Sequence, residues 1–157
     1  MNHHIRPFTP ADVEDIKSCL IELQDFERLM DPHRLEGLHV AHEYLQHLLD
    51  LCHDEKGMIF VAEKNKSIIG MISVYIEDDH KHFRKMRTFA HIADLIVMKE
   101  RKDEGVVKDL LAKAEEYAKS KHVSSIQATI LHEHAEGLAG YLRNGFHEHE
   151  VVVRKHL

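Results

Sequence analysis

The chain has 157 residues, of which 43% are hydrophobic and 31% charged, a composition typical of a globular protein. This length predicts a single domain spanning residues 1–157. The net charge of −6, with no basic arm or face, argues against nucleic-acid binding. No apolar run is long enough to span a membrane, and the acidic first thirty residues do not resemble a signal peptide. Cys19 and Cys52 are too few for a disulfide framework, so we expect a cytoplasmic protein.

The first half of the chain has the pattern of a strand, two helices and a hairpin. The run Thr9-Pro10-Ala11-Asp12 predicts a helix start, with a threonine cap, a proline at the first helical position and a carboxylate three residues after the cap. Apolar residues then recur at helical spacing from Val13 to Met30, and a second stripe runs from Ala41 to Leu49. The strands expected in this half are residues 4–7, 58–63 and 67–76.

The second half of the chain predicts strand–helix–strand units. Strands are expected at residues 87–98, 125–131 and 146–154, and helices at residues 106–120 and 135–144. The resulting order is β-α-α-β-β-β-α-β-α-β, with a hairpin meander in the middle and crossover connections after it. This order predicts an α/β fold in which a mixed sheet is flanked by helices on both faces.

The segment from Ala93 to Phe146 carries the main functional signal. A strand at Ala93–Val97 leads into the glycine-bearing turn Lys102–Val107 and then into an amphipathic helix. Such a turn presents backbone N–H groups and the positive end of the helix dipole, which suit the phosphates of a ligand. One strand and one helix later, the sequence reads Tyr141-Leu142-Arg143-Asn144-Gly145-Phe146.

The order and spacing of these two motifs resemble the GCN5-related N-acetyltransferase (GNAT) family. Members of that family transfer an acetyl group from acetyl-coenzyme A (acetyl-CoA) to an amine. Their turn usually reads Arg/Gln-x-x-Gly-x-Gly/Ala and is followed by Tyr-x-x-x-Gly-Phe. The resemblance covers essentially the whole chain. It implies a GNAT-like, mostly antiparallel sheet, acetyl-CoA as co-substrate and a primary amine of a small molecule or peptide as acceptor.

The resemblance also implies which residues bind the coenzyme. Pantetheine would lie along the end of the strand, and the pyrophosphate would lie on the turn. The implied coenzyme-binding residues are Ile96, Val97, Met98, Lys99, Lys102, Gly105, Val106, Val107, Lys108, His134 and Tyr141. Three of them depart from the family pattern, because Lys102 replaces arginine or glutamine, Val107 replaces a small residue and His134 replaces a frequent asparagine.

Three residues are candidates for proton transfer. The resemblance implies that Tyr141 protonates the departing thiolate, and a phenol suits this role because it retains its proton at neutral pH. His91 and Asp94, on the strand that leads to the turn, are candidates for the base that deprotonates the amine. Their separation puts them on opposite faces of the sheet unless a bulge intervenes. Each of the three could instead be structural, and a water chain without a dedicated base is a further alternative.

The acceptor is expected beside the first two helices. Residues 22–36 carry five carboxylates against two arginines, which could attract a cationic amine, although such runs are usually a solvated helix face. Two other functions remain open: a regulatory domain that binds acyl-CoA with weakened catalysis, and a metal- or pH-responsive binding protein suggested by the 16 histidines. We assign no metal site, because the His-x-His pairs 132/134 and 147/149 supply too few ligands on one face.

The last expected strand contains Val151-Val152-Val153, an apolar edge that proteins tend to pair or cover. We therefore expect a homodimer in which a second chain covers this end of the sheet and borders the acceptor site. The charged residues that flank the valines offer the alternative, since they could keep such an edge soluble in a monomer.

Overall fold

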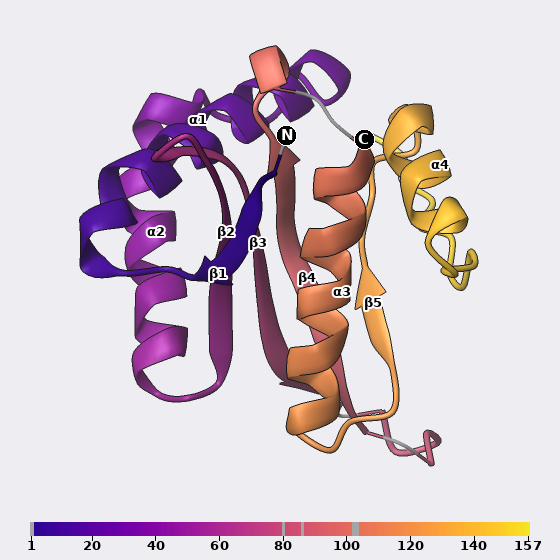
Figure 1. Cartoon of the computed structure of the whole chain (residues 1–157). Coiled ribbons are helices and arrows are strands. Elements are labelled where there is room, and N and C mark those ends of the chain that lie inside the picture. Colours follow the sequence, from indigo (N-terminus) through magenta and orange to yellow (C-terminus); the bar gives the residue numbers. More distant parts are fainter. Residues whose placement is uncertain (1, 80, 86, 102–103) are drawn as a thin grey trace.

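The computed structural model describes residues 2–79, 81–85, 87–101 and 104–157. Within them, five strands form one sheet in the order β1-β2-β3-β4-β5, and four α-helices pack around it (Figure 1). The strands are β1 (His4–Pro7), β2 (Gly57–Lys64), β3 (Ser67–Asp78), β4 (Thr88–Val97) and β5 (Ile126–Ala128). The helices are α1 (Val13–Met30), α2 (Gly37–His53), α3 (Glu104–Ser120) and α4 (Ala135–Arg143), with short 3-10 helices η1 (Pro10–Asp12) and η2 (Lys99–Arg101). None of the helices in these ranges combines the length and apolar character of a membrane span.

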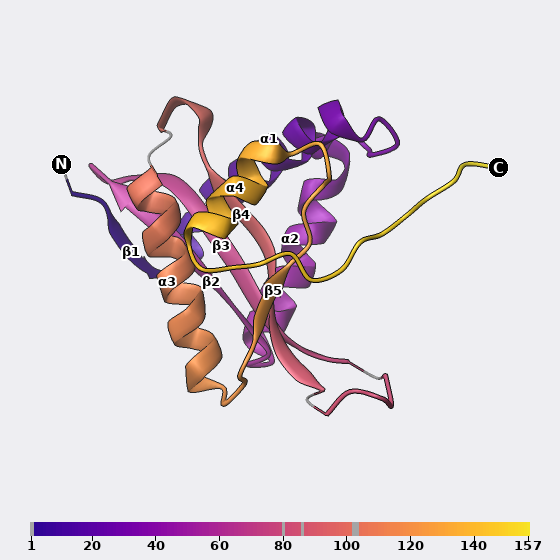
Figure 2. The same cartoon turned by 90° about the vertical axis from the view of Figure 1, so that its right-hand side faces the viewer.

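The sheet is mixed and mostly antiparallel, which confirms the predicted fold class. Strands β1 to β4 pair antiparallel with their successive neighbours, whereas β5 joins the edge of β4 in parallel. Helices α1 and α2 cover one face of the sheet and α3 covers the other, as Figures 1 and 2 show. We call these the α1/α2 face and the α3 face.

Each face buries its own apolar core, because side chains alternate between the two faces along the central strands. The core of the α1/α2 face consists of Ile16, Cys19, Leu20, Leu45, Leu48, Ile59, Val61 and Met71. The core of the α3 face includes Phe60, Ile72, Val74, Ile92, Val106, Leu110, Leu111 and Ala114. Strands β3 and β4 are therefore packed against helices on both faces. The buried polar side chains on them, Ser73 and Asp94, lie within this packing.

Helices α1 and α2 approach each other closely at Gly37, the first residue of α2. Its N–H donates a 2.7 Å hydrogen bond to Oδ1 of Asp25 in α1. A Cβ at this position would lie 2.6 Å from the carbonyl oxygen of Ile21. A side chain at position 37 would therefore push the two helices apart. Asp25 is one of the acidic residues in the expected acceptor wall, and in the structure its carboxylate caps the start of α2.

The predicted strand at residues 146–154 does not form. Residues 146–157 have no regular secondary structure, so the sheet has five strands where the sequence predicted six. Three consecutive valines favour a strand, but that preference describes the fit to a pleated surface beside another strand. Within the described residues, no strand pairs with this segment, and the prediction was wrong.

The end of β4, the N-terminus of α3 and the whole of α4 lie at the same end of the sheet (Figure 1). This arrangement follows from the crossover: β4 runs into η2 and α3, the chain returns as β5 parallel to β4, and α4 follows β5. The start of α3 and the Tyr141–Phe146 motif, far apart in sequence, are thereby brought to one end of the molecule.

Candidate active site

A bulge in β4 sets the orientation of the two predicted base residues. The register of β4 against β3 shifts between Ile92 and Asp94, so Ala93 is an extra residue in the strand. His91 and Asp94, three residues apart, consequently both face α1 and α2. The condition that the sequence left open is met, and both candidates lie on one face of the sheet.

Asp94 is buried at the centre of this face. Its Oδ2 accepts a 2.5 Å hydrogen bond from the hydroxyl of Ser73 on β3 and a 2.6 Å hydrogen bond from the hydroxyl of Tyr44 on α2. Burial raises the pKa of Asp94, and the two hydrogen bonds oppose this effect. Asp94 therefore holds α2 against β3 and β4, and its carboxylate is already engaged by two donors.

His91 is the more accessible of the two candidates, with 18% of its side chain exposed. Its ring lies 5.2 Å from that of Tyr75, and its Nδ1 lies 3.4 Å from Oε2 of Glu77. Burial lowers the pKa of His91, and the carboxylate of Glu77 partly offsets that effect. The imidazole is thus predominantly neutral at pH 7, the form that a general base requires.

Tyr141 lies on α4 with its ring half-buried. The ring packs edge-on against that of Phe146, with centroids 5.1 Å apart, and contacts the core of the α3 face. Burial raises the pKa of Tyr141, and the negative charges of Asp94 and Glu27 raise it further. The phenol therefore keeps its proton at neutral pH, as the predicted acid must.

His134 has a structural role at the start of α4. Its Nδ1 accepts a 3.2 Å hydrogen bond from the N–H of Gly137, which caps the helix. Its ring also meets that of Phe26 edge-on, with centroids 5.0 Å apart. Because Nδ1 acts as an acceptor, the proton of the neutral ring resides on Nε2.

Glu27 of α1 is electrostatically coupled to these groups, although the sequence indicated only an acidic wall. Burial raises the pKa of Glu27, and the negative charge of Asp94 raises it further. The guanidinium of Arg34, 3.1 Å from the Glu27 carboxylate, opposes this rise. Arg34 also lies 3.4 Å from Asp31, so part of the predicted acidic wall is neutralised within the protein.

The end of β4 offers an open strand edge. Strand β5 pairs with β4 only from Ala90 to Ile92. Farther along, the N–H of Met98 donates to Ile69 on β3, so strand alternation directs the N–H groups of Leu95 and Val97 to the opposite side. Within the described residues, no strand pairs with this part of the edge.

The predicted coenzyme residues of β4 use their side chains inside the protein. Ile96 and Met98 pack against the core of the α1/α2 face, and Val97 packs against the core of the α3 face. The N–H of Lys99 is engaged by Glu22, whose Oε2 lies 3.2 Å away. Contacts from this stretch to a ligand would therefore come from the backbone of β4 or the exposed side chain of Lys99.

The turn between β4 and α3 is described in part. Lys102 lies outside the described residues. Gly105 is half-buried in the first turn of α3, and Lys108 is exposed. Val106 is buried in the core of the α3 face and Val107 packs against it, so the branched side chain that departs from the family pattern has a place in the core.

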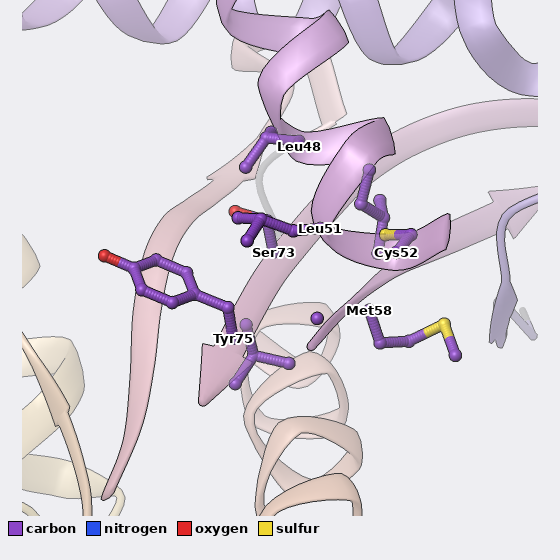
Figure 3. Close-up of a pocket in the computed structure, with 9 residues that line it drawn as sticks. Leu48, Leu51, Cys52, Met58, Ser73 and Tyr75 are labelled. Carbon is purple, nitrogen blue, oxygen red and sulfur yellow. The ribbon is translucent and has the colours of Figure 1, made fainter. Parts of the chain in front are cut away.

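Two hollows lie near these groups. A crevice too narrow to admit a water molecule lies between α2 and the hairpin of β2 and β3. Figure 3 shows mainly apolar side chains around it, with the hydroxyl of Tyr75 pointing away from Leu51 and Cys52. A second hollow, which we call the acidic groove, has a volume of about 520 Å³. Its lining residues are Glu77, Asp78, Asp79, Lys81, Arg84, Phe89, Gln127 and Glu150.

The acidic groove opens beside His91. Gln127 of β5 pairs with His91 in the sheet, and Glu77 is the carboxylate next to its ring. Arg84 neutralises part of the groove through ion pairs with Asp79 at 3.0 Å and Glu150 at 2.7 Å. Within the described residues, no three His, Cys, Asp or Glu side chains are grouped so that they could hold a metal ion.

Sequence reasoning did not assign roles to Tyr44, Ser73, Tyr75 or Glu77. Ser73 carried a local signal, because it is a polar residue within the apolar run of β3. Tyr44 was correctly placed on the packed side of α2, but its partner Asp94 is fifty positions away and no local pattern identifies it.

The fold matches several solved structures. A transcriptional regulator from Bacillus halodurans C-125 matches with a TM-score of 0.76 and 20% identity, over 99% of this chain and 100% of that one. A predicted acetyltransferase with acetyl-CoA from Clostridium acetobutylicum matches with a TM-score of 0.76 and 15% identity, over 99% and 96%. The aminoglycoside antibiotic 6'-N-acetyltransferase AAC(6')-IG from Acinetobacter haemolyticus matches with a TM-score of 0.72 and 19% identity, over 100% and 98%. At these identities the likeness establishes the fold alone.

No curated protein matches the chain in sequence. The family model described as "Acetyltransferase (GNAT) family" matches residues 22–146, a range that contains β4, the turn before α3 and the Tyr141–Phe146 motif. The match extends over most of the chain and agrees with the fold and with the motifs. The chain therefore belongs to the acetyltransferase (GNAT) family.

Proposed function

We propose that the protein transfers an acetyl group from acetyl-CoA to a primary amine of a small molecule or peptide, by direct attack of the amine on the thioester. The observation that carries this proposal is the bulge at Ala93. It turns His91 toward the same face as Asp94, on the strand whose open edge leads to the N-terminus of α3.

The residues at this end of the sheet fit the coenzyme. The N–H groups of Leu95 and Val97, directed away from β3, supply donors for the pantetheine amides and the thioester carbonyl. The first turn of α3 supplies helix N–H groups and the positive end of a dipole for the pyrophosphate. The Clostridium acetobutylicum structure, whose description includes acetyl-CoA, has the same fold and supports this assignment.

Two residues handle the protons of the reaction. His91, neutral at pH 7, takes a proton from the ammonium of the acceptor, directly or through water, so that the nitrogen lone pair can attack. The new N–C bond forms as the C–S bond breaks. Tyr141 gives its phenolic proton to the departing sulfur, the proton left on the product nitrogen returns through water to the Tyr141 phenolate, and His91 releases the proton it took to solvent. Asp94 positions the strand and α2 and does not touch the reacting atoms.

The acidic groove is the proposed entrance for the acceptor. It opens beside His91, and the carboxylates of Glu77 and Asp78 suit the positive charge of an amine. Amine-modifying activity is named for the Acinetobacter haemolyticus neighbour, a 6'-N-acetyltransferase of aminoglycosides. This supports an amine acceptor as a class and leaves the individual compound to experiment.

The decisive test combines binding and turnover. Acetyl-CoA should raise the melting temperature of the protein, and a panel of primary amines should contain compounds that release free thiol from acetyl-CoA in its presence. Stabilisation by acetyl-CoA without turnover of any amine would favour the regulatory acyl-CoA-binding alternative. The proposal would be overturned if acetyl-CoA neither stabilised the protein nor reacted with any of the amines.

A further inference from the structure

The carboxylate of Glu77 lies beside one ring nitrogen of His91. In the sheet, His91 of β4 pairs with Tyr75 of β3, and Glu77 follows Tyr75 by two residues. Residues two apart on a strand share a face, so Glu77 is a diagonal neighbour of His91, within the reach of a long side chain. Its Oε2 lies 3.4 Å from Nδ1 of His91. The register of β3 against β4 therefore sets this contact.

Nδ1 of His91 has different surroundings from the rest of the ring. It is buried and forms no hydrogen bond within the described residues, whereas 18% of the side chain is exposed. The exposed part of the imidazole therefore lies away from Nδ1. A buried ring nitrogen requires a hydrogen-bond partner, and hydrogen bonds between catalytic groups are often long until substrate binds. Oε2 of Glu77 is an acceptor placed where Nδ1 can use it.

The other neighbours of the ring are aromatic or neutral. The ring of Tyr75 is tilted by 30° to that of His91 with centroids 5.2 Å apart, and the ring of Phe89 lies at 6.4 Å. Gln127 of β5 pairs with His91 from the other side. Burial lowers the pKa of His91, and the charge of Glu77 acts against that effect. The packed rings restrict how the imidazole can turn, so its Nδ1 side stays toward Glu77.

We propose that Glu77 is a positioning residue for the base: its carboxylate accepts the Nδ1–H of His91 and leaves the lone pair on Nε2, the atom that removes the proton from the acceptor amine. This inference rests on the proposed function, in which His91 is the base. The hydrogen bond made by one ring nitrogen decides which nitrogen of a neutral histidine carries the proton. When Nε2 takes up the proton of the ammonium, the ring becomes a cation, and the adjacent carboxylate stabilises that cation while remaining ionised. His91 then releases the proton to solvent.

Nuclear magnetic resonance of the ring nitrogens tests the contact without any turnover. The full chain is used, and the signals of His91 are identified by their absence in His91→Gln. In the neutral ring of the wild type, the proton should reside on Nδ1. In Glu77→Gln, which keeps the size of the side chain and removes its charge, His91 should titrate at lower pH because the imidazolium has lost its counter-charge. Asp78→Asn is the matched control, since Asp78 lines the same groove and its Oδ1 accepts from Thr88 at 2.9 Å. It should move the titration of His91 less.

Kinetics then test the role in catalysis. In Glu77→Gln, kcat should fall by about tenfold or more, the acid limb of kcat/KM should move to lower pH, and KM for acetyl-CoA should stay within about twofold. Asp78→Asn should act mainly on KM for the acceptor. A proton on Nε2 in the wild type, an unchanged titration of His91 in Glu77→Gln, or an unchanged kcat in that variant would each overturn the proposal. A wild type that carries the proton on Nδ1 but acetylates no amine would overturn the proposed function and support the contact between Glu77 and His91.

Discussion

Tyr44 of α2 and Asp94 of β4 are joined by a 2.6 Å hydrogen bond across fifty positions of sequence. Because Ser73 of β3 donates to the same oxygen, one carboxylate connects two strands and a helix. Helix α2 therefore cannot move relative to β3 and β4 without breaking these hydrogen bonds, and the position of His91 is tied to that of α2.

Replacing Tyr141 with phenylalanine should reduce turnover and leave binding nearly unchanged. The ring would still pack against Phe146, so the fold is preserved, but the proton donor for the departing sulfur is lost. We expect kcat to fall by about 10²–10³, with KM for acetyl-CoA within about twofold of the wild type. Thiol release measures both quantities. Tyr75→Phe, which removes a hydroxyl from another tyrosine on the same face of the sheet as His91, is the control, and equal losses in the two variants would contradict a specific role for Tyr141.

The pH profile should report the protonation of His91. Burial lowers its pKa, so the neutral base persists until the pH falls below the ordinary histidine value of about 6.5, and activity should decline only there. In His91→Gln, kcat/KM should fall by about 10² and lose this acid limb. If the variant retains the limb, the titrating base is a different group.

Asp94 should contribute strongly to stability. In Asp94→Ala, the hydroxyls of Tyr44 and Ser73 lose their acceptor, and we expect a loss of about 2–4 kcal/mol in the free energy of unfolding. Asp94→Asn retains an accepting oxygen and should lose less. Denaturant unfolding followed by circular dichroism measures both variants, and similar losses in the two would argue against these hydrogen bonds as the cause.

The stability that Asp94 contributes should depend on pH, and comparing wild type with Asp94→Asn tests this. Burial raises the pKa of Asp94 above its unfolded value, so the folded protein holds this proton more tightly. The associated stability is present at low pH and is lost as pH rises through the folded pKa. The stability difference between wild type and Asp94→Asn should consequently be larger near pH 4 than at pH 7. The opposite order would indicate a lowered pKa.

Glu22 should weaken coenzyme binding. Its carboxylate accepts from the N–H of Lys99, close to where we propose that the pyrophosphate binds. Glu22→Gln keeps an accepting oxygen and removes the negative charge, so affinity for coenzyme A should rise by about twofold to tenfold at low salt. Calorimetric titration measures this change. Glu14→Gln, an exposed substitution on the same helix, is the control, and matching effects in both would reflect net charge alone.

Two glycines should respond oppositely to alanine. Gly37→Ala should destabilise the protein by about 2–3 kcal/mol, because the new Cβ would lie 2.6 Å from a backbone oxygen of α1. Gly140→Ala, in the interior of α4, has its nearest neighbour at 3.9 Å and should stabilise the protein by up to about 1 kcal/mol. Thermal unfolding of the two variants gives the comparison, and a neutral Gly37→Ala would mean that α1 and α2 separate easily.

Local features of the fold were predictable from the sequence. The helix start at Thr9 forms as expected, with its N–H donating to Asp12 at 2.7 Å, because capping depends on residues only three apart. The apolar periodicity of α1 and α2 likewise predicted which side chains are buried. These signals reside within a few consecutive residues and do not require knowledge of the partner strand.

The features that sequence could not supply depend on register. The bulge at Ala93 becomes visible only when β4 is aligned with β3, and it decides that His91 and Asp94 share a face. The engagement of Asp94 by Tyr44 requires the packing of α2 on the sheet. The valines at the end of the chain were expected in a strand, but residue preference could not say whether a neighbouring strand exists.

The bulge in β4 determines which residues of the strand face the same side of the sheet. In a regular strand, residues an odd number of positions apart face opposite sides of the sheet. The extra residue at position 93 reverses this alternation, so His91 and Asp94 face the same side although they are three positions apart. Removing that one residue, whose methyl side chain takes no part in the proposed chemistry, would return β4 to simple alternation. His91 would then have to face α3, or Asp94 would have to leave Ser73 and Tyr44. The spacing along this strand is therefore as much a constraint on the protein as the identity of its ionisable residues.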